Sequence, residues 1–188
     1  MPRLDEKRTF LALNIPTEIK SELNFLLAKL SKNIDYVKWV GPESLHITIH
    51  FLGNLSLAKI DELIRHLKLL ENKYNQEMEF AIGKLNAFPN IFNARVIFLE
   101  CFQQSGTSVI KLHKETLDEL MKLKLDYDLR KWSPHLTLGR VKNKINPQIF
   151  SQYSLKKRLL FKVRSFDLME SELTPTGAKY KIIQSFQF

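Results

Sequence analysis

The chain has 188 residues, 44% hydrophobic and 26% charged, which is typical of one globular domain or of two small lobes sharing an interface. No apolar run reaches the roughly 18 residues of a transmembrane helix, and the single cysteine, Cys101, excludes an internal disulfide and any cysteine-cluster metal site. The net charge of +9 lies almost entirely in residues 95–188, with 17 Lys and Arg against 9 Asp and Glu.

Strand-like and helix-like stretches alternate along the first half of the chain. Apolar and aromatic runs bounded by Pro, Gly or Asn predict strands at 8–16, 36–40, 45–53, 77–88 and 93–101. Apolar residues at intervals of three and four predict one helix after Pro16 and a second after Ser56, whose side chain can cap it.

The second half continues the same alternation. A third helix is predicted after Gly106, and the strand-like run 132–140 follows it. The last two stretches, 158–173 and 178–188, are predicted to form a hairpin over Pro175, Thr176 and Gly177.

The order of elements indicates the fold class. A plan of strand, helix and strands occurs approximately twice, so we predict an α+β fold of two similar lobes. Their antiparallel sheets would face each other across a cleft, with the helices packed on the outside. Because no linker or low-complexity segment interrupts the chain, residues 1–188 are predicted to be a single bilobal domain.

One short pattern occurs twice. LHITIHFL at 45–52 and WSPHLTLGR at 132–140 each contain His, an apolar residue, Thr and a second apolar residue. Side chains alternate between the faces of a strand, so His46 and Thr48 share one face, as do His135 and Thr137. If the two sheets face each other, these four polar side chains converge in one cleft. Aliphatic neighbours in both copies, and one copy in each half, make chance an inadequate explanation.

Two imidazoles and two hydroxyl groups are sufficient for phosphoryl chemistry that uses no metal. One imidazole can take a proton from the nucleophile while the other gives a proton to the leaving oxygen. The threonine hydroxyls can donate to the non-bridging phosphate oxygens, where negative charge gathers in the transition state. The residues alone do not assign the acid and the base.

A metal site of His46, His50 and His135 is the alternative use of these histidines. Alternation places His50 on the same face as His46, but no carboxylate lies nearby in sequence, so we expect no metal. The sequence contains neither a Gly-rich phosphate loop nor an HExxH motif. His66 and His113 fall on predicted helices, where surface or packing roles are expected.

The chain resembles the two-histidine (2H) phosphoesterase superfamily, and within it the RNA 2′,3′-cyclic phosphodiesterases, long called 2′-5′ RNA ligases. The resemblance covers nearly the whole sequence. It is carried by RTFLALNIP, LHITIHFLGN, NARVIFLEC, SPHLTLGRV and SELTPTGAKYKIIQSF. His50 is a departure from the family pattern, in which a variable residue is expected.

The resemblance implies hydrolysis of an RNA-terminal 2′,3′-cyclic phosphate to a 2′-phosphomonoester, without a metal or a cofactor. This product requires the P–O3′ bond to break. By the resemblance, His46 is the proton donor to the departing 3′ oxygen and His135 is the proton acceptor that activates water. Thr48 and Thr137 would hold the phosphate.

Four further residues are candidates for substrate contact. Arg140 is either a phosphate or RNA contact or one half of a structural ion pair, and alternation points it away from the cleft unless Gly139 bends the strand. Tyr36, Trp132 and Tyr180 would stack a terminal base, or else they only pack against neighbouring strands.

The basic second half fits a surface that binds the RNA backbone, and a solvated face that only maintains solubility is the alternative. Eight of its cations follow the second motif: Arg140, Lys142, Lys144, Lys156, Lys157, Arg158, Lys162 and Arg164.

Other functions use the same residues. These are 2′-5′ RNA ligation and hydrolysis of a small cyclic nucleotide, whereas a non-catalytic RNA-binding protein would not need two proton-transferring histidines. We expect RNA ends bearing a 2′,3′-cyclic phosphate as the partner, no membrane and a monomer. The charged N-terminal residues indicate no signal peptide, so a cytoplasmic protein is expected.

Overall fold

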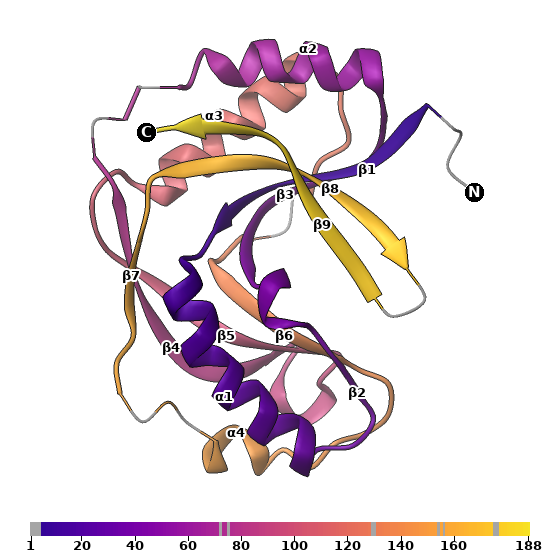
Figure 1. Ribbon diagram of the computed structural model, residues 1–188, viewed down its shortest axis with the longest axis vertical. Helices are drawn as coiled ribbons and strands as arrows, with labels where there is room; N and C mark the ends of the chain where they lie inside the picture. Colours follow the sequence, from indigo (N-terminus) through magenta and orange to yellow (C-terminus); the bar gives the residue numbers. More distant parts are fainter. Residues whose placement is uncertain are drawn as a thin grey trace.

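Figure 1 shows the computed structural model of the chain, which describes residues 5–71, 73–74, 76–128, 131–153, 155, 157–174 and 177–188. Its elements are β1 (Glu6–Asn14), α1 (Thr17–Asn33), β2 (Val37–Trp39), η1 (Pro42–Ser44), β3 (His46–Ser56), α2 (Leu57–Lys68), β4 (Met78–Phe88), η2 (Ile91–Asn93), β5 (Val96–Ser105), α3 (Val109–Lys122), β6 (His135–Val141), α4 (Ile149–Gln152), β7 (Leu160–Val163), β8 (Ser165–Thr174) and β9 (Gly177–Gln187). Pro175 and Thr176 of the predicted turn, and Lys156 of the basic stretch, lie outside the described residues. Within these ranges, no helix has the length and apolar character needed to cross a membrane.

Within the described ranges, nine strands form one antiparallel sheet in the order β7-β4-β5-β6-β3-β1-β8-β9, with β2 beside β6. The sheet curls into two lobes (Figure 1). One lobe contains β1, β3, β8 and β9 with α2 and α3, and the other contains the remaining strands with α1 and α4. The α+β class with two lobes is therefore confirmed.

The two lobes are not the two halves of the sequence. β8 and β9, from the end of the chain, pair beside β1, whereas β2 and β4, from the first half, lie beside β6 and β5. α3, from the second half, packs with α2 over the first lobe (Figure 1). Each lobe is consequently held together by contacts between distant parts of the chain.

The sheet is continuous between the lobes but narrow at their junction. β3 and β6 share a single ladder pair, Ile47 with Leu136. Both side chains are fully buried, and they belong to one apolar core that runs through both lobes. The junction therefore has little backbone pairing to fix the separation of the motif strands. Side-chain contacts must supply the other interactions that hold β3 and β6 together.

The helices begin where capping side chains satisfy free backbone N–H groups. The Ser56 hydroxyl accepts from the Lys59 N–H at 3.3 Å, as the sequence predicts, and Ser108 caps α3 through Lys111 at the same distance. On α2 the residues at intervals of three and four, such as Ile60 and Leu63, are buried.

The predicted strand 158–173 is two strands. β7 pairs with β4 in one lobe, and after Arg164 the chain crosses to the other lobe, where β8 pairs with β1. The short helix α4 was also not predicted, because four residues are too few to show a helical period.

Candidate active site

The motif strands β3 and β6 are neighbours at the junction between the lobes. As alternation predicts, the motif aliphatics are buried in the core, whereas the motif histidines and threonines are only partly buried. His46 and Thr48 come from one lobe and His135 and Thr137 from the other. The structure thus brings together the four side chains that the sequence singles out.

A β-bulge interrupts β3 directly after the first motif. In its ladder with β1, Thr48 pairs with Ala12 and His50 pairs with Leu11, so Ile49 has no partner. One extra residue reverses the alternation beyond it. His50 therefore turns into the core, where it is 3% exposed, and the prediction that it shares the face of His46 is wrong.

A second bulge occupies the same place in β6. Thr137 pairs with Phe98 and Gly139 pairs with Ile97, so Leu138 is skipped. The reversal moves Arg140 onto the face of Thr137, which strict alternation would forbid. A bend near Gly139 was the condition under which Arg140 would point into the cleft, and the structure contains this bend.

The two bulges make Phe51 and Arg140 equivalent residues. Each follows its motif histidine by five positions, and each lines the space on both sides of the motifs. Phe51 is 58% exposed although it is a large apolar side chain. The position of Phe51 beside the motifs was not predicted from the sequence, because only the bulge brings this side chain to the motif face.

The same backbone device orients both imidazoles. His46 Nδ1 lies 2.7 Å from the Ser44 carbonyl, and His135 Nδ1 lies 2.8 Å from the Ser133 carbonyl. A carbonyl only accepts, so both Nδ1 atoms carry hydrogen and both Nε2 atoms present the lone pair that can take up a proton. The Thr48 hydroxyl, 3.0 Å from His46 Nε2, then donates to it. The serine two places before each histidine was a visible repeat that sequence reasoning overlooked.

Aromatic side chains enclose each imidazole. The His46 ring lies 4.9 Å from Phe10 and 5.1 Å from Tyr180 between centroids, whereas His135 lies 5.0 Å from Phe88 and 5.1 Å from Phe98. Burial, slightly offset by the carbonyl hydrogen bond, lowers the pKa of His46 to about 4. Burial also lowers the pKa of His135. Both histidines are therefore neutral at pH 7 in the free protein.

Two hollows meet at the motifs. The His46 hollow, of about 540 Å³, includes His46, Phe51 and Tyr180 in its walls together with the cations Arg8, Lys38, Arg140 and Lys179. The His135 hollow, of about 630 Å³, is lined by His135, Thr48, Thr137, Phe51, Phe88, Trp132 and Arg140. Since Phe51 and Arg140 belong to both, the hollows are two arms of one cleft.

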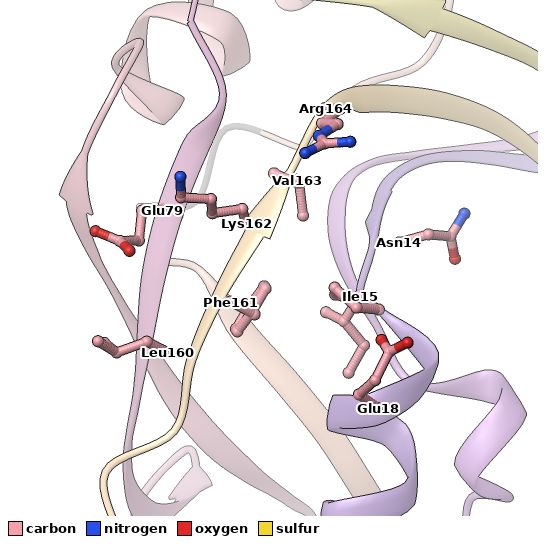
Figure 2. Close-up of a pocket in the computed structure, with 10 residues that line it drawn as sticks. Asn14, Ile15, Glu18, Glu79, Leu160, Phe161, Lys162, Val163 and Arg164 are labelled. Atoms are coloured by element: carbon pink, nitrogen blue, oxygen red, sulfur yellow. The ribbon is translucent and has the colours of Figure 1, made fainter.

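Another hollow lies away from the histidines, between the edge strand β7 and the start of α1 (Figure 2). Figure 2 shows Lys162 and Arg164 extending from the β7 side of it. Both cations form ion pairs with the one carboxylate of Glu77, which offsets part of their charge. This hollow contains no motif residue and contributes nothing to the candidate active site.

Trp132 ties the two motifs together. Its indole N–H donates to the Thr48 carbonyl at 2.9 Å, and the carbonyl of the next residue, Ser133, accepts from His135. His113 stacks on the indole at 4.6 Å, and its backbone carbonyl lies 3.0 Å from His50 Nε2. A segment that holds both motifs makes up for the single ladder pair between β3 and β6.

Replacing Trp132 with Phe is expected to lower kcat about 5- to 10-fold with little change in KM. The substitution removes one hydrogen bond of about 1 kcal/mol and loosens the spacing of the motifs. Steady-state kinetics on a cyclic phosphate substrate measure kcat and KM separately. Trp39→Phe is the matched control: Trp39 also lines the cleft, in the His46 hollow, but its buried indole N–H has no hydrogen-bond partner among the described residues. An equal effect of both variants would contradict the positioning role.

The histidines do not form a metal site in this arrangement. His50 Nε2 lies in the core within 3.1 Å of the Thr116 hydroxyl, on the opposite face from His46. Across the described residues, no three His, Cys, Asp or Glu side chains come together as ligands. The donor set therefore does not fit the alternative of a site formed by His46, His50 and His135.

Of the other residues predicted to contact the substrate, some lie in the cleft and others do not. Tyr180 lies against His46 in the His46 hollow, whereas Tyr36 lines neither arm of the cleft and is 63% exposed. Burial raises the pKa of the Tyr180 phenol, although Arg140 and Arg8 partly offset the rise. Much of the basic stretch after the second motif lies elsewhere, for example Lys157, which is paired with Glu22.

Comparison of the sequence with known proteins gives consistent matches. Residues 13–98 match the family described as LigT like Phosphoesterase. The chain is 32% identical over 186 residues to the RNA 2′,3′-cyclic phosphodiesterase of Archaeoglobus fulgidus, covering 96% of this chain and 99% of the relative. It is 30% identical over 190 residues to that of Methanocaldococcus jannaschii, covering 95% and 99%.

Solved structures share the fold. A protein of Thermus thermophilus superposes with a TM-score of 0.79 at 22% identity, covering 96% of this chain and 97% of that one. E. coli LigT complexed with 3′-AMP gives a TM-score of 0.79 at 18% identity, covering 97% and 98%.

The curled two-lobed sheet, with a His-x-Thr pair on each motif strand, defines a two-histidine phosphoesterase. With relatives at 30% identity or more over almost their whole length, the chain belongs to the LigT-like family of RNA 2′,3′-cyclic phosphodiesterases.

Proposed function

We propose that the protein hydrolyses RNA-terminal 2′,3′-cyclic phosphates to 2′-phosphomonoesters, using two histidines and no metal. The observation that carries this proposal is the matched pair of imidazoles, each fixed through Nδ1 by a backbone carbonyl and each with Nε2 available for proton transfer. The relatives named RNA 2′,3′-cyclic phosphodiesterase support the substrate class.

In the proposed reaction a water oxygen attacks phosphorus in line with the P–O3′ bond. His135 Nε2 accepts the proton of this water, and His46, protonated at Nε2, gives its proton to O3′ as that bond breaks. The phosphorus keeps its O2′ link, which leaves a 2′-phosphomonoester and a 3′-hydroxyl. Assignment of His46 as the acid rests on the family resemblance.

Donors in the cleft stabilise the charge that develops on phosphate. The hydroxyls of Thr48 and Thr137 and the guanidinium of Arg140 line the His135 hollow, and we propose that they bind the non-bridging oxygens. A bound phosphate anion beside His46 also favours the protonated imidazole that the acid role requires.

The activity is expected to have an acidic pH optimum in kcat/KM, which reports the free enzyme. The active form carries a proton on His46 and none on His135, and burial holds both pKa values below the usual 6.5. Above the higher pKa the protonated fraction of His46 falls about tenfold per pH unit, so kcat/KM falls likewise. A plateau that extends above pH 7 would contradict this assignment.

Acid instability must be separated from this profile. His46 and His50 resist protonation in the folded state, with pKa values of about 4, whereas in the unfolded chain they protonate near pH 6.5. Unfolding therefore takes up protons below pH 6.5, and stability falls as the pH falls. Circular dichroism at each pH, with activity remeasured after return to pH 7, identifies any loss due to unfolding.

A phosphatase assay tests the proposed function. An oligoribonucleotide ending in a 2′,3′-cyclic phosphate is incubated with the protein in EDTA and then treated with phosphatase, which removes only monoesters. We expect the terminal phosphate to become sensitive. Resistance after long incubation would contradict the proposal, whereas joining to an added 5′-hydroxyl RNA would favour 2′-5′ ligation.

A further inference from the structure

Four cations from four different strands line the His46 hollow. They are Arg8 on β1, Lys38 on β2, Arg140 on β6 and Lys179 on β9. All four side chains are exposed, so they can contact a ligand in the hollow. They come from both lobes, and only Arg140 belongs to the basic stretch that the sequence singled out.

These four cations are unpaired. In the described part of the chain, none of them forms a hydrogen bond or an ion pair through its side chain. Among the described residues, no Asp or Glu side chain lines the His46 hollow. This differs from the carboxylate-paired cations elsewhere, such as those in Lys7–Glu170, Lys59–Glu62, Lys73–Glu115, Lys122–Glu119, Lys157–Glu22, Lys162–Glu77 and Lys181–Glu172. A cluster of uncompensated positive charge thus borders His46.

This charge exceeds what the reacting phosphate needs. A 2′,3′-cyclic phosphodiester carries one negative charge, and Arg140 with the two motif threonines already lines the neighbouring arm of the cleft. Arg8, Lys38 and Lys179 are left without an anion. Several unpaired cations in one groove are the usual arrangement for a chain of phosphates.

The direction of the reaction places the rest of the RNA in the same hollow. If His46 protonates O3′, the ribose and its 5′-linked chain lie on the His46 side of phosphorus, and water enters from the His135 side. The His135 hollow also has cations in its lining, Arg95, Lys131 and Arg140, but Asp128 lies among them. The His46 hollow, with four cations and no carboxylate in its described lining, is therefore the more positive arm and the one in which upstream phosphates would lie.

We propose that Arg8, Lys38 and Lys179 bind the internucleotide phosphates upstream of the terminal nucleotide, so that the preferred substrate is an oligoribonucleotide chain. This inference rests on the proposed function. It predicts that the ratio of kcat/KM for a decaribonucleotide to kcat/KM for a nucleoside 2′,3′-cyclic phosphate exceeds about ten.

The test compares three substrates at several salt concentrations: the decamer, a nucleoside 2′,3′-cyclic phosphate, and the same nucleotide with a 5′-phosphate. The double variant Lys38→Gln/Lys179→Gln is expected to lower the ratio about tenfold and to flatten the salt dependence of decamer hydrolysis by a slope of about 1.4. Lys157→Gln removes a lysine charge outside the cleft and is expected to leave the ratio within twofold of wild type.

Each other outcome overturns the inference. An unchanged ratio in the double variant would show that these lysines do not bind the internucleotide phosphates, and the proposed function would still stand. Equal hydrolysis of the decamer and the 5′-phosphorylated nucleotide would restrict the site to one phosphate. If wild type hydrolysed none of the three substrates, the proposed function would fail and the inference with it.

Discussion

Replacing His135 with Ala is expected to lower kcat by about 10²- to 10⁴-fold, and His46→Ala is expected to do the same. Each substitution removes one of the two proton-transfer atoms, while the buried aliphatics of its strand keep the fold. Because the two histidines act in one step, the double variant is expected to be hardly worse than either single variant.

Single-turnover assays at saturating protein measure this loss free of binding effects. His66→Gln is the control, since His66 lies on α2 and pairs with Glu119 away from the cleft. It is expected to stay within twofold of wild type. Loss of activity in only one of the two motif variants would show that a single histidine is sufficient.

Replacing Thr137 with Val is expected to lower kcat by about 10²-fold at nearly constant substrate affinity. Within the described residues the Thr137 hydroxyl makes no hydrogen bond, although it lines the His135 hollow, so it is free to donate to phosphate. A donor that acts on charge in the transition state contributes to kcat more than to binding. Valine keeps the volume of the side chain, which limits packing effects.

Thr48→Val is expected to be at least as harmful, because the Thr48 hydroxyl also hydrogen-bonds His46 Nε2. Thr107→Val, in the loop before α3, is the matched control. Equal kcat values for Thr137→Val and Thr107→Val would remove Thr137 from the proposed phosphate contacts. Comparison of kcat and KM across the three variants is the decisive readout.

The sequence predicts this site well where the strand period is unbroken. His46 and Thr48 alternate with buried aliphatics as expected, and so do His135 and Thr137. Periodicity fails one residue later, because a bulge is a pairing irregularity between two strands and leaves no mark in either strand alone.

Three residues were affected by these bulges. His50 was placed on the cleft face and lies in the core, Arg140 was left undecided and lies in the cleft, and Phe51 was not considered. The matched positions of Phe51 and Arg140 became apparent only from the ladders. For Trp132 the sequence left base stacking and packing as alternatives. Its hydrogen bond to the Thr48 carbonyl, a contact between residues 84 positions apart, was not predicted.

The sequence predicted two lobes but not which strands belong to each lobe. An α+β class follows from the alternation of elements, yet the pairing of β8 with β1 depends on contacts between distant residues. The cations of the His46 hollow illustrate the same point. Arg8, Lys38 and Lys179 are scattered in the sequence, and only the sheet order brings them to one groove.

Hydrolysis in ¹⁸O-labelled water, with EDTA present, tests the central claim most directly. A short RNA with a terminal 2′,3′-cyclic phosphate is converted, and ³¹P NMR and mass spectrometry locate the phosphate and the label. The two-histidine account predicts a 2′-phosphomonoester with one ¹⁸O on phosphorus and an unlabelled 3′-hydroxyl. A 3′-phosphomonoester, or turnover only after a divalent metal is restored, would contradict it.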